Sequence, residues 1–116
     1  MVIEDDVDVR DALVEVLSDN GYTTIQASNG QEAIELLRSA LPMPTLILLD
    51  VMMPVMDGWE FRNAQRADAS IAEIPVVVLT AHANAQRTAE QMAAAGFLKK
   101  PVTLEALLET IDKFCG

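Results

Sequence analysis

The sequence predicts a single α/β domain in which a parallel sheet of five strands is covered by helices on both faces. Two observations carry this prediction. Short apolar segments alternate strictly with amphipathic helical segments along the 116 residues, and such alternation is typical of parallel sheets with helical crossovers. The apolar segments, such as Leu46–Leu49, are too short for helices and are typical of strands buried on both faces.

Amino-acid composition and net charge argue against some classes of binding partner. Apolar residues make up 51% of the chain, and the net charge is −10 with a pI near 4.3. A nucleic-acid binder would carry a basic surface, and an anionic membrane would repel this chain. We therefore expect protein partners, with no nucleic acid and no membrane among them.

Cysteine content and the first residues indicate the compartment. Cys115 is the only cysteine, so no internal disulfide can form. Acids follow directly on Met1–Ile3, a pattern unlike that of a signal peptide. No apolar segment of the sequence reaches the length of a membrane span. We expect a cytoplasmic protein.

The chain begins with a short strand and an amphipathic helix. Met1–Ile3 is expected to be the end of the first strand. Asn20 and Gly21 form a helix-terminating pair, so the first helix should end there. Its apolar face is predicted to consist of Val9, Ala12, Leu13, Val16 and Leu17.

A second strand and a second helix follow. Tyr22–Ala27 is rich in β-forming residues and predicts the second strand. The next helix begins after the turn at 28–30 and is stopped by Pro42 and Pro44. Its apolar face is predicted to consist of Ala33, Leu36, Leu37, Ala40 and Leu41.

The third and fourth strands flank a weakly amphipathic helix. The third strand is expected to end at Asp50, and the fourth to cover Pro75–Thr80. Between them a helix is predicted to begin near Asp57, which precedes a glycine and can cap it, and to run to about Ala67. Its apolar face is predicted to consist of Trp59, Phe61 and Ala64.

The last third of the chain predicts two helices and one strand. An alanine-rich helix should cover about Ala85–Ala95, with Ala89, Met92 and Ala93 facing inward, and end at Gly96. Phe97–Lys99 is the predicted fifth strand. Thr103 is the expected cap of a final helix. The apolar face of that helix is predicted to consist of Leu104, Leu107, Leu108 and Ile111.

For five strand–helix units the common doubly wound arrangement is the flavodoxin-like order 2-1-3-4-5, with a crevice between strands 1 and 3. We expect this order here. Polar residues follow four of the five strands, and this edge is where open α/β sheets bind ligands. They are Glu4, Asp5 and Asp6 after strand 1, Asp50 at the end of strand 3, Thr80 at the end of strand 4 and Lys100 after strand 5.

This set of residues suggests phosphoryl transfer to a carboxylate. Acids crowded into one crevice repel unless a cation neutralises them, and Mg²⁺ prefers oxygen ligands. Asp50 is the candidate nucleophile, because aspartate can form a phosphorylated intermediate. Lys100 and Thr80 would stabilise the charge on the transferred group. Each residue also has a plain structural explanation: the acids could favour a helix start, and the lysine and threonine could simply end their strands.

Four motifs resemble a known family. They are Val2-Ile-Glu-Asp-Asp6, Asp50-Val-Met-Met-Pro54-Val-Met-Asp-Gly58, Pro75-Val-Val-Val-Leu-Thr-Ala81 and Lys100-Pro101. In this order and spacing they resemble the receiver domain of bacterial two-component response regulators, chiefly stand-alone receivers of the chemotaxis-regulator type. The resemblance covers residues 1–116 and implies one receiver domain.

The resemblance implies a role for each site residue. Asp50 would accept a phosphoryl group from a phosphohistidine on a sensor histidine kinase or a phosphotransfer protein. Glu4 and Asp5 would hold Mg²⁺ together with Asp50 and the backbone carbonyl of Met52. Such a domain catalyses its own phosphorylation and dephosphorylation and is not a classical enzyme. Lys100 would pair with the phosphoryl group.

The resemblance also implies a switch. Thr80 would be the switch hydroxyl and Phe97 the switch aromatic residue, and Lys100–Pro101 would be a cis peptide. His82 and Met52 would flank the phosphoryl group, although an exposed loop histidine is an equal alternative. The chain departs from the family pattern where Ala95-Gly96 leads directly to Phe97, which shortens that loop.

The output is expected to be a change of surface. The chain stops after the fifth helix, so we expect a stand-alone receiver or one cut from a longer protein. Phosphorylation would alter the face made by the fourth helix, fifth strand and fifth helix, which a downstream protein target would read. Receivers often pair weakly through this face, so a weak homodimer is also expected.

Three alternatives remain open at this point. The first is a receiver-like interaction module that is never phosphorylated. The second is a phosphatase with an aspartyl nucleophile, although such enzymes often carry a second acid two residues later, where this chain has Met52. The third is an FMN carrier of the same sheet order, but the acids Glu4, Asp5 and Asp6 would repel its phosphate.

Overall fold

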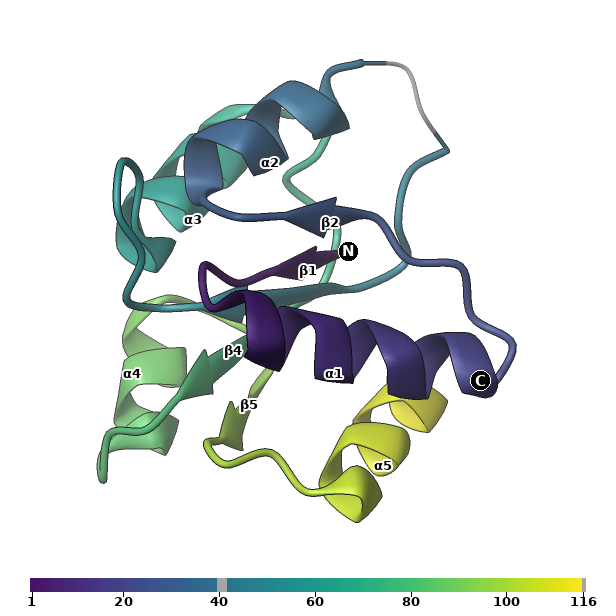
Figure 1. Cartoon of the computed structure of the whole chain (residues 1–116). Helices are drawn as coiled ribbons and strands as arrows, with labels where there is room; N and C mark the ends of the chain where they lie inside the picture. Colours follow the sequence, from purple (N-terminus) through teal and green to yellow (C-terminus); the bar gives the residue numbers. More distant parts are fainter. Residues whose placement is uncertain (40–41, 116) are drawn as a thin grey trace.

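Strands and helices alternate throughout residues 1–39 and 42–115, the part of the chain that the computed structural model describes (Figure 1). The strands are β1 (Val2–Ile3), β2 (Gln26–Ala27), β3 (Ile47–Asp50), β4 (Val76–Thr80) and β5 (Gly96–Lys99). The helices are α1 (Val7–Asp19), α2 (Gly30–Leu37), α3 (Gly58–Ala67), α4 (Ala85–Gln91) and α5 (Leu104–Cys115). This confirms the predicted succession of elements.

The strands form one parallel sheet in the order β2-β1-β3-β4-β5. The predicted flavodoxin-like arrangement is therefore confirmed. Ile3 lies opposite Leu49, and Asp50 lies opposite Leu79. The carboxyl ends of β1, β3 and β4 consequently meet at one edge of the sheet, where the loops after these strands lie next to one another.

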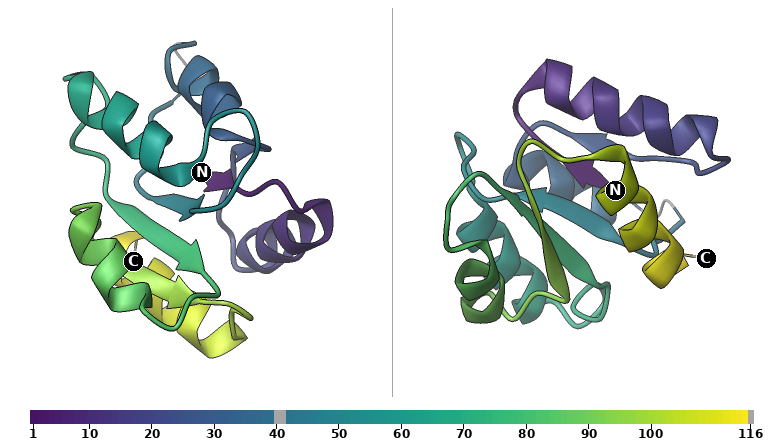
Figure 2. Two further views of the ribbon diagram at one scale, coloured as in Figure 1. Left: turned by 90° about the vertical axis from the view of Figure 1, so that its left-hand side faces the viewer. Right: turned by 90° about the horizontal axis from the view of Figure 1, so that it is seen from below.

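Two hydrophobic clusters lie on opposite faces of the sheet. Successive side chains of a strand point to opposite faces, and in β3 Ile47 and Leu49 belong to one cluster while Leu48 belongs to the other. Helices α2, α3 and α4 contribute to the first cluster, and α1 and α5 to the second. In Figure 2, α1 and α5 lie together on one side of the sheet. The sheet is thus buried on both faces, as the apolar strands predict.

Several helix ends follow from local sequence. Gly21 adopts a φ of 85°, and the Tyr22 amide donates to the Leu17 carbonyl, which closes α1 as expected. Asp57 caps α3 in a reciprocal capping box with Glu60.

At the start of α5 the Thr103 hydroxyl accepts a hydrogen bond from the amide of Ala106. This confirms the predicted cap. Not every residue of the predicted apolar faces is buried, however. Ala12, Trp59 and Leu104 are exposed to solvent, Leu104 by 56%.

Strand β2 is shorter than predicted. The β-forming segment Tyr22–Ala27 contributes only Gln26 and Ala27 to the sheet. Its neighbour β1 is itself only two residues long, and β2 lies at the edge of the sheet with no second partner. A strand can extend only as far as a neighbour offers backbone groups, so β-forming composition alone overestimated its length.

Helix α2 also ends earlier than predicted. Its last residue is Leu37, and Ser39 already lies in a turn, where its hydroxyl donates to the Leu36 carbonyl. Serine side chains compete in this way with helical backbone bonds. Ala40 and Leu41, which we expected on the apolar face, lie outside the described residues.

Helix α4 ends at Gln91 rather than near Ala95. Ala93 has a φ of 52° and is exposed, so it does not face inward as predicted. Its amide donates to Glu90 and that of Ala94 to the Ala89 carbonyl, which is the Schellman arrangement. The predicted terminator, Gly96, is instead the first residue of β5.

No helix among the described residues is long and apolar enough to cross a membrane.

Candidate functional site

The carboxyl edge of the sheet brings three acids together. Glu4 follows β1 directly, Asp5 comes next, and Asp50 is the last residue of β3. Carboxylate oxygens of the three residues lie within 4.8 Å of one another. Glu4 and Asp50 are buried, whereas Asp5 is exposed. The predicted switch-point crevice therefore holds a compact group of acidic oxygens.

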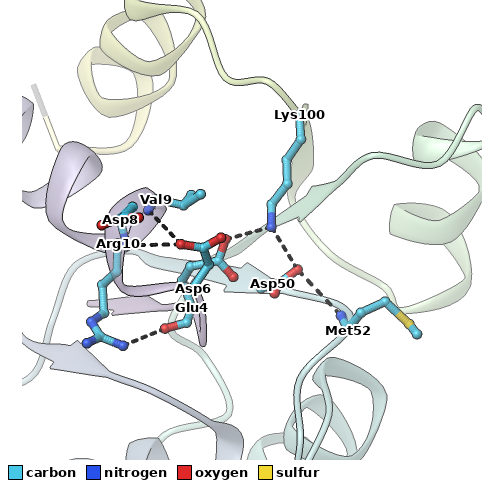
Figure 3. A network of polar contacts seen from close by, with 8 residues as sticks. All are labelled: Glu4, Asp6, Asp8, Val9, Arg10, Asp50, Met52 and Lys100. Atoms are coloured by element: carbon cyan, nitrogen blue, oxygen red, sulfur yellow. Dashed lines mark hydrogen bonds and ion pairs between the residues drawn. The ribbon is translucent and has the colours of Figure 1, made fainter.

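Lys100 reaches this group from the end of β5 (Figure 3). Its Nζ donates to Glu4 Oε1 at 2.6 Å and lies 3.2 Å from Asp50 Oδ1. The other Glu4 oxygen, Oε2, is buried and has no hydrogen-bond partner among the described residues. One lysine thus neutralises only part of the acidic charge. The Lys100–Pro101 peptide bond is cis, as expected.

The environment shifts the pKa values of the paired groups in predictable directions. Burial raises the pKa of Glu4 from 4.5 to about 8, and the nearby Asp50 adds to this, while Lys100 opposes it. For Lys100, burial alone would lower the pKa, but the attraction of Glu4 and Asp50 outweighs burial, and the pKa is raised. Glu4 therefore retains a proton near neutral pH that a bound cation could displace.

Close packing fixes the position of Asp50. The Gly58 amide donates to the Val51 carbonyl at 2.9 Å, which brings the start of α3 against the end of β3. A Cβ on Gly58 would lie 2.7 Å from the Asp50 backbone oxygen, so only glycine fits. The Met52 amide lies 3.4 Å from Asp50 Oδ1, and its side chain is 69% exposed.

Thr80 and Phe97 occupy opposite environments. The Thr80 side chain is buried at the end of β4, and its hydroxyl accepts a hydrogen bond from the His82 amide at 3.1 Å. Its carbonyl accepts from the Lys100 amide at 2.9 Å. Phe97 lies in β5 and is 41% exposed. The His82 side chain is exposed, and only its backbone makes a contact of this kind.

Two neighbouring residues support the site, and sequence reasoning assigned no role to one of them, Arg10. Asp6 does not join the acidic group; its side chain accepts from the amides of Asp8 and Val9 and caps α1 (Figure 3). Arg10 donates to the Glu4 carbonyl at 2.8 Å and so supports the loop that carries the acids. The only feature of the sequence that could have pointed to Arg10 is that it is the only basic residue between positions 4 and 19.

The acidic group has the chemistry of a site for a hard divalent cation. Carboxylate oxygens are the ligands that Mg²⁺ prefers, and Mg²⁺ commonly uses one or two of them. The orphaned Glu4 Oε2 is a further observation in favour of a cation, because a buried polar atom without a partner is costly. The residues present therefore fit Mg²⁺.

Comparison with known proteins identifies the family. A family model described as the response regulator receiver domain matches residues 1–112. Response regulator MprA of Mycolicibacterium vanbaalenii is 40% identical over 110 residues, which are 93% of this chain and 46% of that protein. The polar-differentiation response regulator DivK of Brucella anthropi is 30% identical and aligns with 100% of this chain and 94% of its own.

Structural similarity agrees. The chemotaxis response regulator CheY4 of Vibrio cholerae superposes with a TM-score of 0.87 at 30% identity, over 97% of this chain and 94% of that one. The chain belongs to the response regulator receiver domains, the phosphoacceptor domains of two-component signalling. It spans about half the length of the MprA regulators that it matches and nearly all of DivK.

Proposed function

We propose that Asp50 is the phosphoacceptor of this receiver domain. The observation that carries the proposal is the convergence of Glu4, Asp5 and Asp50 at one edge of the sheet with the ammonium group of Lys100. Asp50 ends a buried strand and is itself buried, so its carboxylate is held in place. No other acid of the group combines this position with contact to Lys100 and the Met52 amide.

The transfer needs little from the protein except position and charge. An Asp50 oxygen attacks the phosphorus of a phosphohistidine; the new O–P bond forms as the N–P bond breaks, and the imidazole leaves with its electron pair and takes a proton. Lys100 would neutralise charge on the phosphoryl oxygens. Bound Mg²⁺ would supply further neutralisation, held by Glu4, Asp5 and Asp50 with the Met52 carbonyl.

The switch would work through Thr80. Its hydroxyl now accepts a bond from the His82 amide, and turning toward the phosphoryl group would break that bond. Phe97, now 41% exposed, would then repack toward the sheet. This would bias an existing equilibrium between two surfaces of α4, β5 and α5, which a downstream protein would read and through which weak homodimers could form.

The partners are proposed by class. A sensor histidine kinase or phosphotransfer protein would donate the phosphoryl group, in the cytoplasm. The net charge of −10 suits a partner whose docking surface is basic, because complementary charge speeds association. Nucleic acid and membrane are not expected partners of this domain.

Intact-protein mass after incubation with a small phosphodonor tests the proposal. We expect one phosphoryl addition that requires Mg²⁺ and is lost in Asp50→Asn. The matched control is Asp57→Asn, which changes a nearby acid in the same way and keeps the helix cap, since asparagine caps as well as aspartate. No addition in the unchanged protein, or full addition in Asp50→Asn, would contradict the proposal and favour a receiver-like module that is never phosphorylated.

A further inference from the structure

Helix α4 is held very differently at its two ends. At the amino end, Asn84 makes no side-chain hydrogen bond to cap the helix, and no acid lies in the first turn. Residues 81–84, which connect this end to β4, are all exposed. At the carboxyl end, by contrast, the Schellman bonds of Ala93 and Ala94 close the helix.

The side chains that pack α4 onto the sheet increase the difference. Ala85 and Ala89 are buried in the first two turns, and Met92 is buried just after the last. A buried alanine removes little apolar surface from water, whereas a fully buried methionine contributes about 1.5–3 kcal/mol. The packing energy is therefore concentrated at the carboxyl end.

Arg62 of α3 completes the attachment of that end. Its Nε donates to the Met92 carbonyl at 2.9 Å and its Nη2 to the Ala93 carbonyl at 2.7 Å. These carbonyls lie at the helix terminus, which carries negative partial charge and favours a cation. One rigid guanidinium thus binds two orphan acceptors, which a lysine could not do with the same geometry.

A second side chain, Gln65, fixes the position of the Arg62 guanidinium. Its Nη1 donates to Gln65 Oε1 at 2.7 Å. Gln65 is completely buried, and its amide nitrogen donates to the carbonyls of Ile71 and Ile74 at 3.0 Å each. The carboxyl end of α4 is therefore connected through two side chains to the segment that leads into β4.

There is room for the amino end to move. A hollow of about 320 Å³ runs along α4 and is lined by Met52 and Trp59 and, from the α4 segment, by Asn84, Arg87, Thr88 and Gln91. The loop before α4 is joined to the rest of the site by the bond from the His82 amide to Thr80 Oγ1. Breaking this bond would release the amino end of α4, while the contacts of Arg62 would remain.

We infer that Arg62 and Gln65 anchor the carboxyl end of α4, so that the helix pivots about this end when the domain switches. The pivot rests on the proposed switching function, but the anchor does not, because its contacts exist in the unphosphorylated domain. Arg62 is in this sense a positioning residue: it touches neither the acids nor the phosphoryl group. The surface that changes most is accordingly the amino-terminal half of α4.

Amide hydrogen exchange, followed residue by residue by NMR on the unphosphorylated chain, tests the anchor. We expect the amides of Thr88 and Ala89 to exchange at least about tenfold faster than those of Ala93 and Ala94, since local opening is easiest where contacts are few. In Arg62→Met, which keeps an apolar stem but loses the donors, exchange at Ala93 and Ala94 should rise by at least about tenfold.

The matched control is Arg66→Met, on the same helix one turn later. The Arg66 side chain is exposed and makes no hydrogen bond or ion pair within residues 1–39 and 42–115, so exchange should stay within about twofold of the original. Should Arg62→Met fail to fold, Arg62→Lys, whose ammonium lacks the planar fork that bonds both carbonyls, replaces it, with a smaller rise in the same direction. Unchanged exchange at Ala93 and Ala94 in the folded Arg62 variant, or an equal rise in Arg66→Met, would overturn the anchor.

Beryllofluoride with Mg²⁺, a mimic of the phosphoryl group on a carboxylate, tests the pivot. Thr88 and Ala89 should then show large chemical-shift changes and Ala93 and Ala94 small ones, and the emission of Trp59, the only tryptophan, should change. Equal shifts at both ends would overturn the pivot. Binding at Asp50 without any response in α4 would also overturn it. No binding at all would instead contradict the proposed function, and the exchange result for the anchor would stand.

Discussion

The Glu4 carboxylate is buried away from solvent, and its Oε2 has no hydrogen-bond partner among the described residues. Its pKa is raised by this burial to about 8, compared with 4.5 in an unfolded chain. The folded state therefore holds this proton more tightly than the unfolded state does. The stabilising contribution is complete below pH 4.5 and is lost as pH rises through about 8.

We predict that Glu4→Gln removes this dependence. In EDTA, the free energy of unfolding of the original chain should fall relative to that of Glu4→Gln as pH rises from about 5 to about 8, as measured by urea unfolding. Burial also lowers the pKa of the Met1 amino group to about 6, which produces the opposite slope, but both proteins share it. Glu15→Gln, on the exposed side of α1, should follow the original chain; parallel curves for Glu4→Gln would contradict the prediction.

Val55 illustrates strain at a single residue. It has a φ of 67°, and the Met56 amide donates to the Pro54 carbonyl across it, so Val55 occupies the centre of a classic γ-turn. A β-branched residue with positive φ is a genuine outlier. The Val55 side chain is 80% exposed, so packing does not compensate for the strain. The turn sits in the loop that carries Met52.

We predict that Val55→Gly stabilises the domain by about 1 kcal/mol, because relief of strain of about 1–3 kcal/mol exceeds the entropic cost of glycine. Urea unfolding at fixed pH measures the change. The matched control is Val7→Gly, another exposed valine but with no positive φ, which should destabilise the domain by about 0.5–1 kcal/mol. If both variants lose stability equally, Val55 is not strained.

At the level of elements, the junction between β3 and α3 depends on one missing side chain. A methyl group at Gly58 would lie 2.7 Å from the Asp50 backbone oxygen and 2.8 Å from the Val51 Cα, both in backbone that cannot easily give way. Gly58→Ala should therefore push α3 away from β3. We expect a loss of about 1–3 kcal/mol in the free energy of unfolding, together with weaker Mg²⁺ binding.

Gly96→Ala is the control for that prediction. Gly96 is likewise the first residue of an element, here β5, but a Cβ added there would meet only Val77 Cγ2, at an ordinary 3.9 Å. Stability within about 0.5 kcal/mol of the original is expected there. A similar loss in both variants would show that glycine flexibility, rather than the close approach at Gly58, decides the outcome.

Sequence reasoning predicted element ends well where the determinants are local. Gly21, Asp57 and Thr103 each act on their own helix through contacts within a few residues, and all three behave as expected. It failed for β2 and for the end of α4. The length of β2 is limited by a partner strand 24 residues away in register, and Ala93 adopts a left-handed conformation that its residue type disfavours.

The same division holds for the site. Glu4, Asp50 and Lys100 could be brought together on paper because each follows a predicted strand and the strand order fixes which ends are neighbours. Arg62 and Gln65 could not, since apart from each other their partners are backbone carbonyls far along the chain. Backbone acceptors leave no trace in residue type, so only coordinates reveal such contacts.

For the whole molecule, the net charge of −10 sets the response to salt. Self-repulsion destabilises a compact acidic protein and is screened by any electrolyte. We therefore expect KCl to raise the melting temperature gradually. MgCl₂ at equal ionic strength should raise the melting temperature further. Binding to the folded state adds up to about 2.7 kcal/mol to the free energy of unfolding at a hundredfold excess over the dissociation constant.

Asp5→Asn separates the two effects, because Asp5 belongs to the acidic group but is exposed. The variant should keep its response to KCl and lose most of the extra effect of MgCl₂. Thermal unfolding in matched salts is the measurement. An undiminished MgCl₂ effect in Asp5→Asn would mean that the cation acts by general screening or at another position.

The two hydrophobic clusters have a consequence for how such a domain can diverge. They lie on opposite faces of the sheet and share no side chain, with α1 and α5 over one and α2, α3 and α4 over the other. Substitutions in separate clusters should therefore combine almost additively. A change beneath α1 and α5, and with it a new recognition surface, should accordingly leave the packing beneath α4 largely undisturbed.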